Sequence, residues 1–174
     1  NQDAFRDLID DLVADLAACR FDVVAGLDAM GFVIGSAIAT RTGRGFLPIR
    51  KAGKLCVATD RVEFGNYSGR VQDMEMRLPA FAPGTRVLVA DQWVETGGTV
   101  DGAIRLIERQ GGRVTGLAAI AIEENPVTDD YRRRLVCASA VVPGSRLQAE
   151  CNAQRLSSFA TYAPERVFPR IGTD

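Results

Sequence analysis

The chain of 174 residues contains no histidine. Histidine is the general base of Ser-His-Asp triads and Cys-His pairs, and it is a common metal ligand. These catalytic classes and His-ligated metal sites are therefore excluded. Cysteine is also sparse, and the four residues form no C-x-x-C pair: Cys19, Cys56, Cys137 and Cys151. The sequence thus carries neither a zinc motif nor a disulfide framework, and we expect a cytoplasmic protein with reduced thiols.

Long apolar runs and a strong net charge are absent as well. No run approaches the roughly 18 apolar residues of a transmembrane helix, and the net charge is −1. We therefore expect neither a membrane nor nucleic acid as a partner. With 47% hydrophobic residues and this length, we expect one domain over 1–174, with its core at 20–142. The sequence begins with Asn1 instead of Met, which leaves open that an N-terminal segment is missing.

Lysine is nearly absent. Among 21 basic residues the only lysines are Lys51 and Lys54, and both lie in the single stretch Ile49–Leu55. A compact ammonium group suits a mobile point contact to phosphate, whereas arginine imposes a planar fork. This stretch is therefore a candidate phosphate-binding segment, with chance placement as the alternative.

Apolar periodicity predicts an alternation of helices and strands. We expect helices over 3–18, 32–42, 99–110 and 129–135, and strands over 21–26, 46–50, 74–78, 86–91, 114–122 and 136–142. We also expect a long flexible loop with extended pieces over 53–72 and an irregular segment over 143–174. This order predicts an α/β fold with a mostly parallel sheet. Ligands of such sheets bind beyond the carboxyl ends of the strands, which places 26–31, 50–55 and 91–99 on one rim.

The segment 87–99 carries the strongest chemical signal. A buried strand ends at Asp91, and Thr96-Gly97-Gly98-Thr99 then opens a helix. Glycines let successive N–H groups converge, and the helix N-terminus adds partial positive charge. The segment therefore predicts a cradle for a phosphate monoester, with Asp91 placed to accept sugar hydroxyls or to hold water on Mg²⁺. For the glycine turn alone, a ligand-free helix start is the alternative. A P-loop and a dinucleotide fingerprint are both missing.

This segment resembles the diphosphoribosyl-binding motif of type I phosphoribosyltransferases. Ala25–Phe32 and Ile49–Leu55 resemble the pyrophosphate loop and the R-K-x-G-K-L segment of adenine phosphoribosyltransferases, in the same order. The resemblance covers residues 3–125. It implies an α/β type I phosphoribosyltransferase fold with a flexible catalytic loop and a small irregular hood. It also implies purine salvage, Mg²⁺ as cofactor, a nucleobase and a phosphosugar pyrophosphate as substrates, and a homodimer.

The resemblance further implies roles for individual residues. The sugar phosphate would be bound by Asp91, Gln92, Glu95, Thr96, Gly97, Gly98 and Thr99. Pyrophosphate would be bound by Asp28, Ala29, Met30, Lys51 and Lys54, with a non-proline cis peptide that is frequent in the family at Asp28-Ala29. The base would lie beside Phe32 and Arg50. No residue would ligate Mg²⁺ directly, because the substrate would hold it and Asp91 would reach it through water.

Two residues are candidates for catalysis, Asp91 and Glu63. Glu63 stands in Val62-Glu63-Phe64-Gly65, which resembles the Leu-Glu-Tyr-Gly of the family's catalytic loop, and it would assist proton transfer at the base. Because this loop is shorter here, a solvated loop glutamate is the alternative. Glu123 and Glu124, at a strand end, are interpreted as surface acids, with proton transfer as the alternative. Trp93 would either pack over the sugar or fill space beneath the loop.

The chain departs from the family pattern at Gln92, Met30 and Cys56, where the family has an acid, an arginine and a proline. Losing one charge-assisted hydrogen bond of about 1.5–3 kcal/mol slows a reaction roughly 10- to 150-fold. The sequence therefore predicts transfer of a phosphoribosyl group to a purine, with adenine favoured, and leaves two alternatives. One is the same chemistry with a non-ribose donor, such as a ketose phosphate pyrophosphate in nucleoside natural-product synthesis. The other is a non-catalytic sensor of the sugar pyrophosphate.

Overall fold

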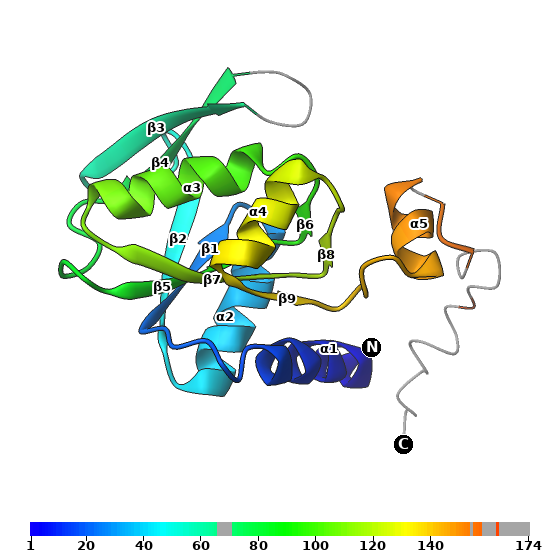
Figure 1. Cartoon of the computed structure of the whole chain (residues 1–174). Helices are drawn as coiled ribbons and strands as arrows, with labels where there is room; N and C mark the ends of the chain where they lie inside the picture. The colour runs from blue at the N-terminus through cyan, green and yellow to red at the C-terminus, as the bar shows by residue number, and fades with distance from the viewer. Residues whose placement is uncertain (66–70, 154, 158–162, 164–174) are drawn as a thin grey trace.

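The structure, a computed structural model, describes residues 1–65, 71–153, 155–157 and 163 (Figure 1). The elements in chain order are α1 (Gln2–Asp15), β1 (Val23–Leu27), α2 (Met30–Thr42), β2 (Gly45–Lys51), β3 (Thr59–Gly65), β4 (Val71–Arg77), β5 (Arg86–Ala90), β6 (Trp93–Val94), α3 (Gly98–Arg109), β7 (Arg113–Ala119), β8 (Ala121–Ile122), α4 (Pro126–Arg134), β9 (Val136–Ser139) and α5 (Arg146–Asn152). None of the helices described here has the length and apolarity that a bilayer crossing requires.

The central sheet has seven strands in the order β3-β4-β2-β1-β5-β7-β9. The five strands from β2 to β9 are parallel, while β4 and β3 continue the sheet antiparallel at one edge. A separate parallel pair joins β6 to β8. The predicted α/β fold with a mostly parallel sheet is therefore confirmed, and the carboxyl ends of β1, β2 and β5 meet on one rim.

Helices cover both faces of the sheet, which explains why β5 is an uninterrupted apolar run. Successive side chains of a strand point to opposite faces. Val87 and Val89 accordingly face the α3 side, in a cluster with Ile107 and Tyr131 of α4. Leu88 faces α1 and α2 on the other side, in a second cluster. Figure 1 shows the same layering, with α3 and α4 on one face and α1 and α2 on the other.

The predicted loop over 53–72 is wrong in part, because β3 and β4 form an antiparallel ribbon. Residues 66–70 of that loop lie outside the described residues. In β3, Val62 and Phe64 are buried and their neighbours are exposed, which is the alternation of a half-buried strand. Charged residues between the apolar positions concealed this pattern in the sequence. The ribbon packs on α3, where Gly102 leaves room for Phe64 and Met74.

The segment 143–174 is not irregular throughout. Residues Arg146–Asn152 form α5, whose start is capped by the Ser145 hydroxyl accepting the Gln148 N–H. Helix α4 also begins earlier than expected, because Asn125 and Thr128 form a reciprocal capping box. The expected strand 114–122 is split into β7 and β8. The remaining predicted elements are present with small shifts at their ends.

Candidate active site

Two adjacent cavities open at the carboxyl ends of the strands, and Thr99 lines both. The larger cavity has a volume of about 750 Å³ and is lined by Asp91, Trp93, Val94, Glu95, Thr96, Gly97, Gly98, Thr99, Val100, Glu123, Cys151, Asn152, Arg155 and Leu156. The smaller cavity, of about 180 Å³, is lined by Leu27, Asp28, Ile49, Arg50, Lys51, Phe64, Gln72, Met74 and Thr99. The structure therefore brings together the three segments that the sequence placed on one rim.

The glycine turn before α3 lines the larger cavity, and the Gly65 carbonyl at the end of β3 packs against Gly98. Gly97 has a φ of +85°, and α3 begins at Gly98 without a side-chain cap. Among the described residues, no acceptor is found for the backbone N–H groups of 96–99. These amides and the positive end of the α3 dipole suit an anion, and phosphate binding at this turn stays a prediction.

Helix α4 supports this turn from behind. The Tyr131 hydroxyl lies 3.0 Å from the Gly97 carbonyl oxygen and 2.6 Å from an Asp101 carboxylate oxygen. Asn125 Nδ2 donates to the Glu95 carbonyl at 2.7 Å. Burial, together with the bond to Asp101, raises the pKa of Tyr131 well above its usual value. Sequence reasoning missed both residues, although Asn125-Pro126 is a recognisable helix start.

Asp91 directly follows β5 and lines the larger cavity. Its Oδ1 accepts the Gln92 backbone N–H at 2.7 Å. Burial nevertheless raises the pKa of Asp91 to about 6, because this one hydrogen bond offsets only part of the desolvation cost. The Gln92 side chain is exposed and lines neither cavity, while its carbonyl accepts from Ile120 and Ala121. Of the two, only Asp91 points to the site in this structure.

The segments expected to bind pyrophosphate surround the smaller cavity. The Asp28-Ala29 peptide bond is cis, as the resemblance implied. Asp28 and Lys51 line the cavity together with Arg50, whose Nε lies 3.4 Å from Asp28 Oδ2. The Arg50 guanidinium stacks over the Phe32 ring at 5.7 Å. The lining includes neither Ala29 nor the exposed residues Met30 and Lys54.

A buried glutamate orders the lysine segment, and sequence reasoning missed it. Glu75 of β4 is fully buried and accepts the backbone N–H groups of Lys54 at 2.7 Å and of Leu55 at 2.8 Å. Burial alone would raise the pKa of Glu75, but the backbone hydrogen bonds outweigh it and lower this pKa to about 2. Arg61 adds an ion pair at 3.2 Å. The carboxylate therefore stays charged and holds the loop after β2 in place.

Glu63 is not brought to the cavities in this structure. Its neighbour Phe64 points inward and lines the smaller cavity, so the side chain of Glu63 projects from the opposite face of β3. The Glu63 carbonyl accepts from Arg105 at 2.5 Å, which ties the ribbon to α3. The catalytic role of Glu63 stays a prediction.

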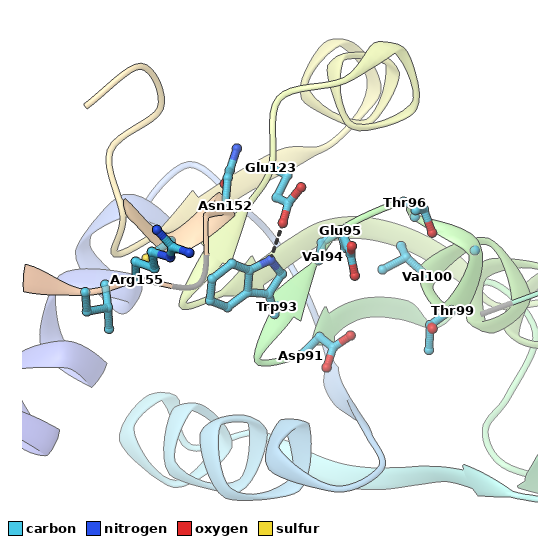
Figure 2. A pocket seen from close by; sticks show the side chains of 14 residues that line it. Asp91, Trp93, Val94, Glu95, Thr96, Thr99, Val100, Glu123, Asn152 and Arg155 are labelled. Carbon is cyan, nitrogen blue, oxygen red and sulfur yellow. Dashed lines mark hydrogen bonds between the residues drawn. The ribbon is translucent and has the colours of Figure 1, made fainter. Parts of the chain in front are cut away.

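Trp93 and Glu123 form a wall of the larger cavity. Trp93 Nε1 donates to Glu123 Oε1 at 2.7 Å, as the dashed line in Figure 2 shows. In that view, Thr96 and Thr99 lie toward one end of the pocket and Arg155 toward the other, with Trp93 between them. The indole also packs on the small cluster of Ala121, Val141 and Cys151. Trp93 thus both lines the cavity and fills space beside it.

This sheet, with an acid and an open glycine turn at one strand end and a lysine segment beside them, defines the type I phosphoribosyltransferase fold. No known family model matches the sequence. The chain is 41% identical over 114 residues to the adenine phosphoribosyltransferase of Agrobacterium fabrum, which is 66% of this chain and 63% of the relative.

Solved structures agree. The adenine phosphoribosyltransferase of Thermoanaerobacter pseudethanolicus matches with a TM-score of 0.71 and 31% identity, covering 80% of each chain. The enzyme of Saccharomyces cerevisiae, solved with an imino-altritol bisphosphate and adenine, matches with a TM-score of 0.68 and 26% identity over 80% of this chain and 79% of that one. The chain belongs to the adenine phosphoribosyltransferase family. Its sequence match spans just under two thirds of the length of the curated relative.

Proposed function

We propose that the protein transfers the 5-phosphoribosyl group of phosphoribosyl pyrophosphate to adenine, giving AMP and pyrophosphate in purine salvage. The observation that carries this proposal is the glycine turn at 96–99 beside Asp91, whose amides have no acceptor among the described residues, next to a second cavity that holds Lys51. The names of the matched relatives support adenine as the base. The yeast structure was solved with adenine and a bisphosphate bound, which supports the same pair of ligand classes here.

The arrangement suits a substitution at the anomeric carbon. The amides at 96–99 would hold the 5-phosphate, and Asp91 would accept a ribose hydroxyl. Lys51 and Arg50 would lie beside the departing pyrophosphate and stabilise its growing charge. Fixed charges aimed at the leaving group are commonly the largest contribution to such a step. The bond to pyrophosphate would therefore loosen while the sugar is held at its other end.

Mg²⁺ is the cofactor that we propose, bound chiefly by the phosphates of the substrate. The described residues contain no cluster of three acids or cysteines able to hold a cation by themselves. Asp91 fits an indirect role, because it lines the cavity and, among the described residues, only one of its two carboxylate oxygens accepts a hydrogen bond. Mg²⁺ prefers to keep several waters and to bind through one carboxylate and substrate phosphates. When bound, the ion would neutralise charge on the pyrophosphate.

The departures at Gln92 and Met30 bear on rate more than on reaction class. Both side chains are exposed and neither lines a cavity, so their replacement leaves the cradle and Asp91 intact. Fewer charged contacts would reduce the rate relative to family members that keep both charges. The comparisons lend no support to a non-ribose donor or to a non-catalytic sensor.

A homodimer and a cytoplasmic location complete the proposal. Apolar side chains lie exposed on and beside α2, among them Met30, Val33 and Phe5. A second copy of the chain would cover this strip, as the family resemblance implies. The four cysteines are free thiols, as expected in a reducing compartment.

The proposed function is tested by incubating the protein with adenine, phosphoribosyl pyrophosphate and Mg²⁺ and separating the products by HPLC. We expect AMP and pyrophosphate in equal amounts, and no AMP from the D91N variant. AMP formation is the supporting result. Product from a ketose phosphate pyrophosphate alone would replace the proposed donor. Binding of phosphoribosyl pyrophosphate without product would make the protein a sensor.

A further inference from the structure

Glu123 is the one carboxylate of the larger cavity that none of the assignments above uses. Its backbone is fixed on both sides, because its N–H donates to the Val94 carbonyl at 2.9 Å and its carbonyl accepts the Thr128 hydroxyl at 2.5 Å. One carboxylate oxygen accepts Trp93 Nε1 at 2.7 Å. In the part of the chain that the structure describes, this is the only hydrogen bond of the carboxylate. Glu123 therefore presents one acceptor oxygen from a rigid position.

The strand order places Glu123 on a particular side of the sugar. The pyrophosphate residues follow β1 and β2, Asp91 follows β5, and Glu123 follows β8, which continues from β7. Because the order in the sheet is β2-β1-β5-β7, the leaving group and Glu123 lie on opposite sides of Asp91. A base that attacks opposite the leaving group would enter from the side of Glu123.

The larger cavity also has the space and the wall that a base needs. At about 750 Å³ it lies within the usual range for small-molecule sites, and it extends from the phosphate turn past Asp91 to Trp93. Purine-sized ligands are generally held by apolar or aromatic side chains with a few fixed polar groups. Trp93 and Glu123 supply one of each, between Thr96 and Thr99 on one side and Arg155 on the other (Figure 2).

We propose that Glu123, held by Trp93, selects a 6-aminopurine by accepting a hydrogen bond from its exocyclic amino group. This inference rests on the proposed function and names its specificity residue. A 6-aminopurine presents a donor at this position, whereas a 6-oxopurine presents an acceptor. An ionised carboxylate can only accept hydrogen bonds. It would therefore face the oxo group of a 6-oxopurine, which is also an acceptor, with no proton between them. A site with such a polar group distinguishes 6-aminopurines from 6-oxopurines more strongly than an apolar pocket would.

The hydrogen bond between Trp93 and Glu123 explains how a single substitution would act against the preference for adenine over hypoxanthine. In E123Q, Trp93 Nε1 can only donate, so it would bind the amide oxygen and turn the amide NH₂ group into the cavity. That NH₂ group would repel the amino group of adenine and match the oxo group of hypoxanthine. Arg50 lines the smaller cavity and stacks over Phe32, and the expected place of these two residues beside the base stays a prediction.

The test compares kcat/KM for adenine and hypoxanthine in wild type, E123Q, W93F and the E123Q/W93F double variant. E124Q is the matched control, since Glu124 is adjacent, exposed and outside the cavity lining. We expect the adenine preference to fall about 10-fold or more in E123Q, through KM for the base, as expected for loss of a charged hydrogen bond. In the double variant the amide can rotate, so the preference should fall less than in E123Q. E124Q should keep the wild-type ratio.

Equilibrium dialysis of labelled adenine and hypoxanthine, with ribose 5-phosphate present, separates this inference from the proposed function. If wild type makes no AMP but the preference for binding adenine still falls about 10-fold or more in E123Q, the inference stands and the activity does not. An unchanged preference in both E123Q and W93F, with AMP formed by wild type, would overturn the inference and leave the activity in place.

Discussion

At the residue scale, Gly97 meets two separate steric requirements of the phosphate turn. Its φ of +85° is costly for any residue with a Cβ, and an added Cβ would lie 2.7 Å from Val127 Cγ1 and 2.8 Å from the Tyr131 hydroxyl. We expect G97A to lower the free energy of unfolding by about 2–5 kcal/mol, from backbone strain and overpacking together. Thermal unfolding would measure the loss, and KM for phosphoribosyl pyrophosphate should rise.

Gly84 offers a matched control for that prediction. It has a similar φ of +82°, but no atom lies within 4 Å of an added Cβ. G84A should therefore cost only the backbone strain, about 1–2 kcal/mol, and leave the KM unchanged. Equal effects of the two substitutions on stability would show that the contacts of Gly97 with α4 are unimportant.

Asp91 gives the activity a defined pH dependence. Burial raises its pKa to about 6 in the folded protein from 3.8, so between these values the folded state binds the extra proton. The contribution of Asp91 to the free energy of unfolding is therefore largest below about pH 4, and it is lost as the pH rises through 6. Acceptance of a sugar hydroxyl needs the ionised form, so kcat/KM should rise through pH 6 to a plateau. A pH–rate profile measures this.

The D91N variant separates the two consequences of that buried charge. It should lose the activity and, relative to wild type, gain stability as pH rises from 4 to 7, because no carboxylate is left to ionise. Denaturant unfolding at several pH values measures the difference, with D15N at an exposed helix end as control. A constant difference between D91N and wild type over this pH range would contradict the raised pKa.

At the element scale, α4 acts as the support of the turn that precedes α3. The Tyr131 hydroxyl reaches the Gly97 carbonyl across 34 positions of sequence, and it is buried. We expect Y131F to remove the single hydroxyl proton that the Gly97 carbonyl and the Asp101 carboxylate share, which costs about 1–3 kcal/mol of stability. KM for phosphoribosyl pyrophosphate should rise more than KM for adenine, as steady-state kinetics would show.

A hydroxyl distant from the site provides the comparison. Thr42 donates to the Ile38 carbonyl at 2.7 Å within α2. T42V removes one hydroxyl hydrogen bond as Y131F does, so stability should fall while both KM values stay as in wild type. Should Y131F behave like T42V, α4 would have a structural role only.

Elements built from neighbouring residues were predictable, and elements that depend on distant partners were not. The run 86–91 and the glycine turn carry their signal within a few positions, so the strand, its terminal acid and the helix start were all found. Strand β3 was missed, and β4 was predicted only over 74–78, because the burial of this ribbon depends on α3, in particular on the space at Gly102. Glu75 reads as a surface acid in sequence, and only the fold shows that it binds the amides of 54–55.

The same distinction holds in the candidate site. The local motifs placed Asp91 and 95–99 at the larger cavity and Asp28 and Lys51 at the smaller one. Glu63 depended on a loose match in a loop, and its side chain lies away from both cavities. Trp93 and Glu123 are 30 positions apart, so their pairing could not be read from spacing.

At the scale of the whole molecule, the apolar strip on α2 adjoins the pyrophosphate loop. Met30 and Val33 lie one helical turn apart and are 44% and 46% exposed, and Phe5 of α1 shares a groove with Val33. A dimer formed through this strip would bury the start of α2, directly after the cis peptide at Asp28-Ala29. The second copy would thereby hold the loop that contacts the leaving group.

A charge in the centre of the strip tests this arrangement. If the proposed homodimer forms through this strip, V33E should convert it into a monomer, because an unpaired carboxylate is costly to bury in an apolar interface. Sedimentation velocity would measure the change. V142E is the control, since Val142 is 65% exposed and lies after β9, outside the strip. If the protein dimerises through α2, V33E should also weaken pyrophosphate binding while V142E does not. A wild-type protein that sediments as a monomer would show that there is no such interface, and a V33E variant that remains dimeric would place the interface elsewhere. In either case the pyrophosphate loop would have to be supported within one chain, by Arg50 and Glu75.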